Sequence, residues 1–223
     1  MWSNESFIQS LILLDSKYLY FTSALLCSLY LIGFFKNGKA YKIFTIYITG
    51  VLLIDFISSN LWSWFRIYNV FMQHFYELFQ FVILSYFFSL LLKTRAQLLT
   101  VYILVIVLPI FLLSRSLINP NLFFEYNHLE PYLTTMPLII YSSMHLYNNL
   151  GEKSDFYYSN LGLLFYLFTS TFSFLIYRLY AVLDIDDKIG DVMTIVNITL
   201  QYIKFGFFFY QWKLIYFNKY ERN

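Results

Sequence analysis

The sequence predicts an all-α integral membrane protein: a polytopic bundle of seven transmembrane helices, with its N-terminus outside and its C-terminus inside. Three observations predict this fold class: the composition, seven long apolar runs, and the uneven distribution of lysine and arginine between those runs. Of the 223 residues, 59% are hydrophobic and only 13% are charged, whereas soluble domains have about 45–50% apolar and about 25% charged residues. A chain so poor in charge cannot cover its surface in water, so its surface must face the lipid bilayer. The composition therefore excludes a soluble enzyme, and the net charge of +2 is too small to suggest nucleic acid as a partner.

Seven runs approach the length of about 20 apolar residues that a helix needs to cross a bilayer. They are too long and too continuous for the strands of a membrane barrel, which alternate with a period of two. Pro109 and Pro137 lie inside two of the runs, and membrane helices tolerate such prolines. We therefore predict that residues 1–223 form a single seven-helix membrane domain with no soluble domain. The predicted spans are 18–35, 43–64, 70–92, 98–113, 132–147, 158–179 and 192–212.

The orientation follows from the lysines and arginines between the spans, which are more numerous on the cytoplasmic side of membrane proteins. The segments after the first, third, fifth and seventh spans hold nine of them, and the segments on the other side hold five. Eight acidic residues fall on the second side, among them Glu125 and Glu130, both assigned to the loop before the fifth span. This asymmetry predicts an outside N-terminus and an inside C-terminus.

Three ionisable residues fall inside predicted spans: Asp55 on the second, Glu77 on the third and Lys204 on the seventh. Charges at membrane depth are costly, so they mark either a function or a specific pairing. At a rise of about 1.5 Å per residue, they lie roughly 15, 10 and 18 Å from the outer ends of their helices. They could therefore meet in one layer.

Amide and histidine side chains extend this polar layer along two helix faces. Gln73, Glu77 and Gln80 share one face of the third span, with His74 beside it, and a second set with the same spacing occurs on the seventh span. Two interpretations are open: a structural salt bridge with an amide ladder, or an outward-facing polar pocket between spans two, three and seven that binds a small ligand or carries protons or ions. The predicted ligand-binding or buried polar network is Asp55, Gln73, His74, Glu77, Gln80, Asn197, Gln201 and Lys204.

We predict no metal site and no cofactor. His74 and Glu77 are one helical turn apart, as in di-metal bundles, but a complete ligand set would need His145 and Asp55 to converge on them. The acidic stretch 184–191 resembles a calcium loop, yet its glycine stands at the seventh position, where the sixth is needed. Sequence motifs of hydrolases, zinc proteases and phosphate-binding loops do not occur in the chain, so we predict no catalytic residues and no enzymatic activity.

The second and sixth spans end alike, because residues 56–68 align without gaps on residues 168–180. With the polar stripes that follow on the third and seventh spans, this similarity indicates a parallel repeat of three helices, one helix and three helices. Some small transporters use this plan.

The run 75–79 (Phe-Tyr-Glu-Leu-Phe), followed by 85–88 (Ser-Tyr-Phe-Phe), is similar to the third helix of small, uncharacterised seven-helix membrane proteins of AT-rich Gram-negative bacteria. Asp55 stands where those proteins often carry glutamate, and residues 156–166 resemble their sixth-helix entry. Lys204 departs from their pattern. Some members resemble the membrane part of sensory signalling systems. The resemblance implies a multi-pass location in the bacterial inner membrane and a receptor-like role.

We therefore expect a non-enzymatic sensor or accessory subunit that works with a partner membrane or signalling protein. The alternative is a small solute or ion transporter that uses the same polar stripe. A transporter needs polar residues that continue to the inner side of the membrane, whereas residues 81–84 and 205–209 are wholly apolar apart from Gly206. This pattern favours a pocket that ends inside the membrane.

Overall fold

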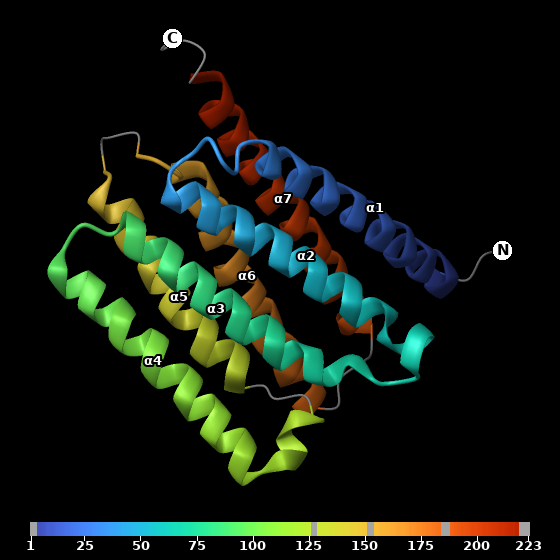
Figure 1. Ribbon diagram of the computed structural model, residues 1–223. Helices are drawn as coiled ribbons and strands as arrows, with labels where there is room; N and C mark the ends of the chain where they lie inside the picture. The colour runs from blue at the N-terminus through green and yellow to red at the C-terminus, as the bar shows by residue number, and fades with distance from the viewer. Residues whose placement is uncertain (1–3, 126–128, 151–153, 184–187, 219–223) are drawn as a thin grey trace. The chain divides into compact units, whose positions relative to one another are not determined.

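The computed structural model is built from α-helices and two short 3₁₀-helices, and it describes residues 4–125, 129–150, 154–183 and 188–218 (Figure 1). The all-α fold class is therefore confirmed. The elements are α1 (Asn4–Ile32), α2 (Lys39–Phe65), η1 (Asn69–Phe71), α3 (Met72–Leu91), α4 (Arg95–Ile118), η2 (Pro120–Phe123), α5 (Leu129–Asn148), α6 (Tyr157–Val182) and α7 (Lys188–Asn218).

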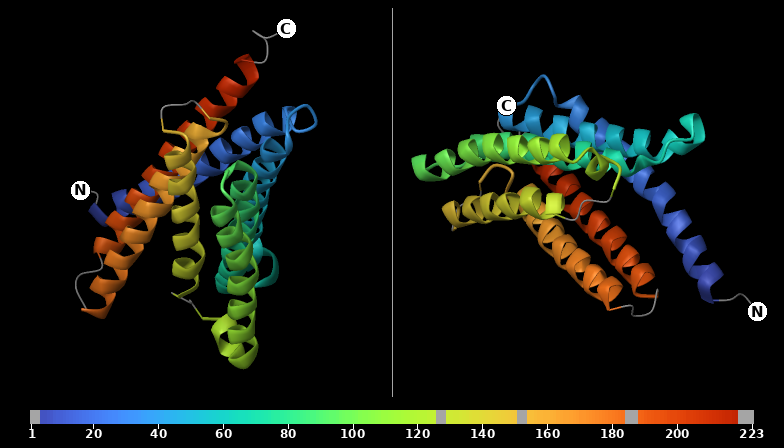
Figure 2. Two further views of the ribbon diagram at one scale, coloured as in Figure 1. Left: turned by 90° about the vertical axis from the view of Figure 1, so that its left-hand side faces the viewer. Right: turned by 90° about the horizontal axis from the view of Figure 1, so that it is seen from below.

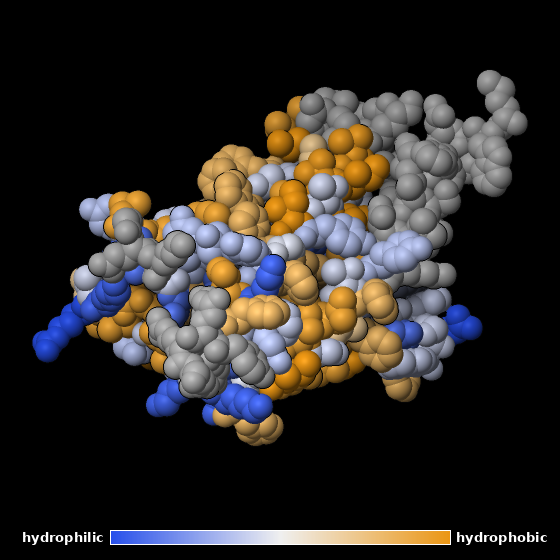
Figure 3. Space-filling view, turned by 90° about the horizontal axis from the view of Figure 1, so that it is seen from above, coloured by the Kyte–Doolittle hydropathy of each residue, from blue (hydrophilic) through white to orange (hydrophobic). Residues whose placement is uncertain are grey.

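Five of these helices are long and apolar enough to cross a membrane: α2, α3 together with η1, α4, α6 and α7. The helix α4 is an example, because its residues are mostly apolar and more than half of them are exposed. Contiguous apolar surface of this extent is rare on soluble monomers and fits contact with lipid. Figure 3 shows many hydrophobic side chains on the surface of the described residues. Exposed apolar residues of α4 include Leu99, Tyr102, Ile103, Ile106, Val107 and Ile110.

Each predicted span overlaps one of the α-helices of the described residues, and the differences lie at the helix ends. The count of seven membrane spans stays a prediction. The fifth span was predicted to begin at residue 132, but α5 begins at Leu129. The prediction that Glu130 lies in a loop is therefore wrong. Pro131 does not prevent this early start, because the backbone N–H groups in the first turn of a helix have no partner within the helix. The shift of three residues places Glu130 in the first turn of α5.

The chain forms two compact units, residues 30–155 and residues 1–29 with 156–223, and each is described by itself. The expectation of a single seven-helix domain stays a prediction. In the first unit, α3 packs against α2, α4 and α5, and Figures 1 and 2 show α2 and α3 side by side. In the second unit, α6 and α7 lie along each other, and the Trp212 indole N–H donates a hydrogen bond of 2.9 Å to the Leu29 carbonyl of α1.

Aromatic rings fill the interface between α2 and α3. Phe44 is fully buried, and its ring centroid lies 5.5, 6.0 and 5.1 Å from those of Tyr30, Tyr47 and Phe87. Such tilted ring pairs each add about 0.5–1.5 kcal/mol beyond the burial of their area. This packing fixes the rotation of α3 about its axis, and that rotation decides which of its side chains face α5.

Replacing Gly50 with alanine is expected to destabilise the protein. The edge of the Phe79 ring lies against Gly50, and an added Cβ would stand 2.5 and 2.9 Å from its Cε1 and Cε2 atoms. Overpacking of this kind costs about 1–3 kcal/mol, more than the gain of up to about 1 kcal/mol in helix propensity. Unfolding by SDS in mixed micelles measures the change. Gly206→Ala is the matched control: nothing lies within 4 Å of its added Cβ, so a loss of stability equal to that of Gly50→Ala would contradict the prediction.

Candidate functional site

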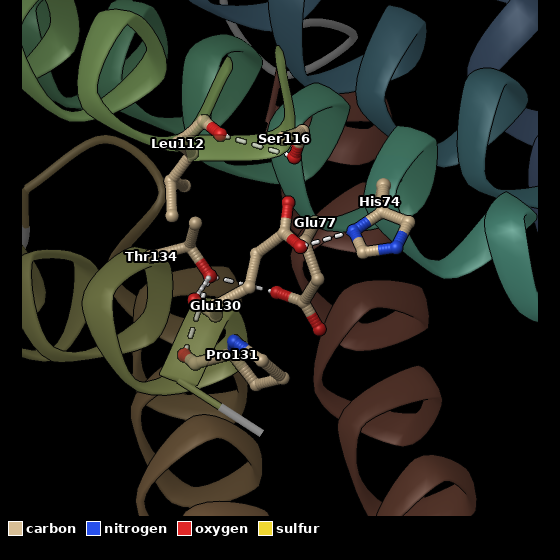
Figure 4. A network of polar contacts seen from close by, with 7 residues as sticks. All are labelled: His74, Glu77, Leu112, Ser116, Glu130, Pro131 and Thr134. Carbon is tan, nitrogen blue, oxygen red and sulfur yellow. Dashed lines mark hydrogen bonds and ion pairs between the residues drawn. The ribbon is translucent and has the colours of Figure 1, made fainter. Parts of the chain in front are cut away.

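Four polar side chains form a buried cluster between α3 and α5, here called the α3–α5 cluster: His74 and Glu77 of α3, and Glu130 and Thr134 of α5 (Figure 4). The two residues on each helix are three or four positions apart, so they share one face of their helix. Contacts of His74 with Glu130, of Glu77 with Thr134, and of Phe88 with Tyr141 follow one another in the same order on both helices. The helices α3 and α5 therefore run parallel, and their first turns meet at the cluster.

The side chains cross between the two helices. The Glu130 carboxylate reaches across to α3 and pairs with Nδ1 of His74, while the Thr134 hydroxyl donates to Oε2 of Glu77 at 2.7 Å. Figure 4 shows the two carboxyl groups next to each other between the helices. The exposed fractions are 4% for His74, 8% for Glu77 and 3% for Glu130. Each charge in the cluster therefore needs a partner from the protein, because burying an unpaired charge costs several kcal/mol.

The Thr134 hydroxyl stands among three acceptors. Besides Oε2 of Glu77, it lies 3.0 Å from the Glu130 carbonyl and 3.2 Å from the Pro131 carbonyl. A hydroxyl carries one hydrogen and can donate it to one of these at a time, while its lone pairs remain free to accept. The position therefore allows a change of hydrogen-bond direction without a movement of heavy atoms.

An aromatic ring closes one side of the cluster. Phe123 of η2 stacks on the His74 imidazole, with 5.2 Å between the centroids and 12° between the planes. The other ring nitrogen, Nε2, is buried and has no hydrogen-bond partner among the described residues. The imidazole is thus held by Glu130 at one nitrogen and by Phe123 on one face.

A second polar group lies one turn further along α3. The side-chain oxygen of Gln80 accepts hydrogen bonds from the hydroxyls of Tyr47 and Tyr76, at 3.3 and 3.1 Å. Gln80 is buried, so these two hydrogen bonds replace the ones that its amide oxygen would make to water if it were exposed. They also extend the polar region from α3 towards α2.

An apolar layer follows the cluster along α3 and α5. Phe81 and Leu84 of α3 and Leu138 of α5 are all fully buried. By position, they lie between the contact of Glu77 with Thr134 and that of Phe88 with Tyr141. Beyond this layer the buried face of α5 becomes polar again, with Tyr141, Ser142 and His145.

The structure brings together only part of the predicted network. Its third-span residues His74 and Glu77 contact α5, whereas Gln80 contacts α2. Gln73 is half-buried, and Asp55 lies on an exposed face of α2. Asp55 is therefore not part of the α3–α5 cluster.

The residues predicted on the seventh span belong to the other unit, so the expected layer that joins them to α3 stays a prediction. Asn197 and Gln201 are half-buried on α7. Lys204 is buried, and its Nζ lies 3.7 Å from the centre of the Tyr166 ring of α6. A cation over an aromatic face at this distance is attracted by the ring quadrupole.

Sequence reasoning missed two members of the cluster, Glu130 and Thr134. Glu130 was assigned to a loop because a proline follows it, and Thr134 was read as an ordinary residue of an apolar run. The available signal was their spacing of four residues, together with the preference for an acidic residue in the first turn of a helix. The α3–α5 cluster therefore joins the third and fifth spans, while the pocket expected between spans two, three and seven stays a prediction.

No group of three or more histidine, cysteine, aspartate or glutamate side chains within the described residues is arranged to hold a metal ion. Residues 184–187 of the acidic stretch lie outside the described residues. No known protein family, curated protein or solved structure matches this chain. The chemistry of the site therefore rests on its own groups: two carboxyls and an imidazole, which take up and release protons, and a hydroxyl, which can donate or accept a hydrogen bond.

Proposed function

We propose that this chain is a non-enzymatic, multi-pass membrane protein that acts as a sensor or accessory subunit through the α3–α5 cluster. The observation that supports the proposal best is that the cluster is buried and bordered by apolar side chains. Two carboxyls and an imidazole are buried together, with Phe123 on one side and the layer of Phe81, Leu84 and Leu138 beyond them. Ionisable groups at membrane depth mark function by default, and a site that ends inside the membrane can register a ligand without conducting it.

The proposal includes seven spans in a bacterial inner membrane, with the N-terminus outside. In this orientation α3 begins at the outer surface, and the α3–α5 cluster lies within the first two turns of α3 and α5. The cluster would then face the periplasm, from which it would receive a small ligand. The bilayer would surround the helices, and a change in the cluster would pass to a partner membrane or signalling protein.

A small solute or ion transporter is the second candidate, and one observation favours it. The buried face of α5 is polar on both sides of Leu138, with Thr134 before it and Ser142 and His145 after it. Rearrangement of the apolar layer would join these two polar regions into a path. The inner halves of the third and seventh spans are apolar, whereas α5 offers polar groups on that side of Leu138.

A measurement of ion flux distinguishes a sensor or accessory subunit from a transporter. We expect proteoliposomes that contain the wild-type protein to carry H⁺, Na⁺ and K⁺ no faster than empty liposomes, as reported by trapped pH-sensitive and ion-sensitive dyes under an imposed gradient. We also expect native mass spectrometry of the detergent-extracted protein to find a second membrane or signalling protein in fixed stoichiometry.

A flux that Glu77→Gln abolishes would overturn the sensor proposal in favour of a transporter. Glu125→Gln is the matched control, because Glu125 is an exposed glutamate outside the cluster. Loss of the flux in both variants would point to a general change of surface charge, and loss in Glu77→Gln alone would assign it to the cluster.

A further inference from the structure

We infer that the ligand of the α3–α5 cluster is a proton, and that Glu77 holds it. This inference deepens the proposed function by naming the ligand of the same site, and it rests on that proposal. It is carried by the geometry of three neighbours: the ion pair of His74 with Glu130, the hydroxyl of Thr134, and the Glu77 carboxyl between them.

The charges of the cluster do not balance while Glu77 is ionised. Glu130 pairs with His74, and a single imidazole can compensate at most one carboxylate. Within residues 30–155, Glu77 contacts a hydroxyl and lies beside a second carboxyl, and no described lysine, arginine or histidine side chain of these residues pairs with it. A bound proton makes Glu77 neutral and leaves the cluster without net charge, which is the form that a buried site accommodates best.

Several titratable groups lie on the elements packed against α3, and the one that faces Glu77 is a carboxyl. From α5, Glu130 faces Glu77 and adds negative charge. On α2, Tyr47 binds Gln80 and Asp55 lies on an exposed face. On α4, Arg115 is half-buried in the last turn, while η1 (Asn69–Phe71) contains no titratable residue. On α3 itself, His74 is engaged by Glu130 and Tyr76 by Gln80.

Thr134 can serve both protonation states of Glu77. When Glu77 is ionised, the Thr134 hydroxyl donates to its Oε2 atom at 2.7 Å. When Glu77 is protonated, the carboxyl O–H can donate to Thr134, and Thr134 turns its own hydrogen to the Glu130 carbonyl at 3.0 Å. While Glu77 is ionised, the Glu130 carbonyl receives no hydrogen bond from the Thr134 hydroxyl. When Glu77 is protonated, it receives one. Proton binding is thereby linked to a hydrogen bond in the first turns of α5.

The exchange step is a simple proton transfer. A hydronium ion from the aqueous phase gives its proton to a carboxylate oxygen of Glu77, an O–H bond forms there, and a water molecule remains. The O–H bond that breaks belongs to the hydronium ion, so no covalent bond of the protein breaks and no oxidation or reduction takes place. Release is the reverse reaction.

Infrared difference spectroscopy of the full-length protein in lipid nanodiscs, between acidic and alkaline buffer, tests the inference. We expect a C=O stretching band of a buried protonated carboxyl in acidic buffer, and its loss in Glu77→Gln. Glutamine has the shape of protonated glutamate, so this variant should fold, which circular dichroism verifies. Glu125→Gln is the matched control and should keep the band, because Glu125 is exposed.

Thr134→Val gives a second test that does not remove the carboxyl. Valine keeps the shape of threonine without the hydroxyl, so ionised Glu77 loses its donor. Protonated Glu77 also loses a hydrogen bond to this hydroxyl, but hydrogen bonds to charged groups are roughly twice as strong as those between neutral groups, so the ionised form loses more. We therefore expect the band to persist to a pH about one unit higher in Thr134→Val than in the wild type.

A band that survives in Glu77→Gln, or a wild type without such a band, would overturn the assignment to Glu77. Loss of the band on addition of Na⁺ at constant pH would overturn it in favour of a monovalent cation. These outcomes are separate from those of the flux experiment. A wild-type flux with the band intact would remove the sensor proposal and keep the proton site, whereas no flux and no band would remove the proton site and keep the sensor proposal.

Discussion

Replacing Glu130 with leucine is expected to lower the free energy of unfolding by about 3–5 kcal/mol. The substitution removes the partner of His74, whose imidazole is 4% exposed and stacked on Phe123. Removing one member of a buried ion pair is costly because the remaining charge must either stay unpaired or lose its proton. Reversible unfolding by SDS in mixed micelles measures the loss.

The double variant His74→Phe/Glu130→Leu provides the control. Buried ion pairs replaced on both sides by apolar residues are often as stable as the original, and a phenylalanine at position 74 keeps a ring against Phe123. We therefore expect the double variant to regain most of the stability that Glu130→Leu loses. A double variant as unstable as Glu130→Leu, or a Glu130→Leu variant as stable as the wild type, would contradict the pairing seen in the structure.

The helices could be predicted from the sequence because the evidence for them is local. The length and composition of each apolar run predict a membrane helix at that place in the chain. The spacing of Gln73, Glu77 and Gln80 likewise places them on one face of α3 without knowledge of any neighbour. His74 and Glu77 were singled out for this reason, and both lie in the cluster. Information within one helix was sufficient to find its polar face.

The partners of that face could not be predicted, because they lie on a helix more than fifty residues away. Thr134 is 57 residues from Glu77, and Glu130 is 56 from His74. A lysine is the obvious counterion for a buried glutamate, and a salt bridge of Glu77 with Lys204, which lies in the other unit, stays a prediction. The hydroxyl that contacts Glu77 within residues 30–155 carries no charge, so a search for buried charges does not find it.

The position of Glu130 shows a second limit. A glutamate followed by proline resembles a loop, and the assignment to a loop removed it from the set of buried charges. The buried face of α5 is nevertheless polar near both ends, with Glu130 at one and His145 at the other. The polar character of α5 also explains why this helix is not among the five that are apolar enough to cross a membrane by themselves. A helix packed against α3 and α4 needs less apolar surface than one surrounded by lipid.

Substitutions of Leu138 test whether the apolar layer closes the site. Leu138→Ala is expected to lower the free energy of unfolding by about 2–5 kcal/mol, because Leu138 is fully buried beside the α3 face that carries Phe81 and Leu84. The cavity that it leaves would be apolar, and apolar cavities of this size stay dry. We therefore expect no increase in proton flux in proteoliposomes, despite the loss of stability, as measured with a trapped pH-sensitive dye.

Leu138→Asn is expected to behave differently, because asparagine keeps the branching and the number of heavy atoms of leucine but places an amide group at this position. Its amide offers donors and an acceptor that can hold water, and a hydrated site needs two to four such polar partners. Water at this position would join Thr134 on one side to Ser142 on the other, both of which are fully buried on α5. We therefore expect a proton flux in Leu138→Asn that Leu138→Ala lacks, and adding Glu77→Gln should reduce it. Equal fluxes in the alanine and asparagine variants would show that protons are excluded elsewhere, and that Leu138 does not separate the cluster from the inner half of α5.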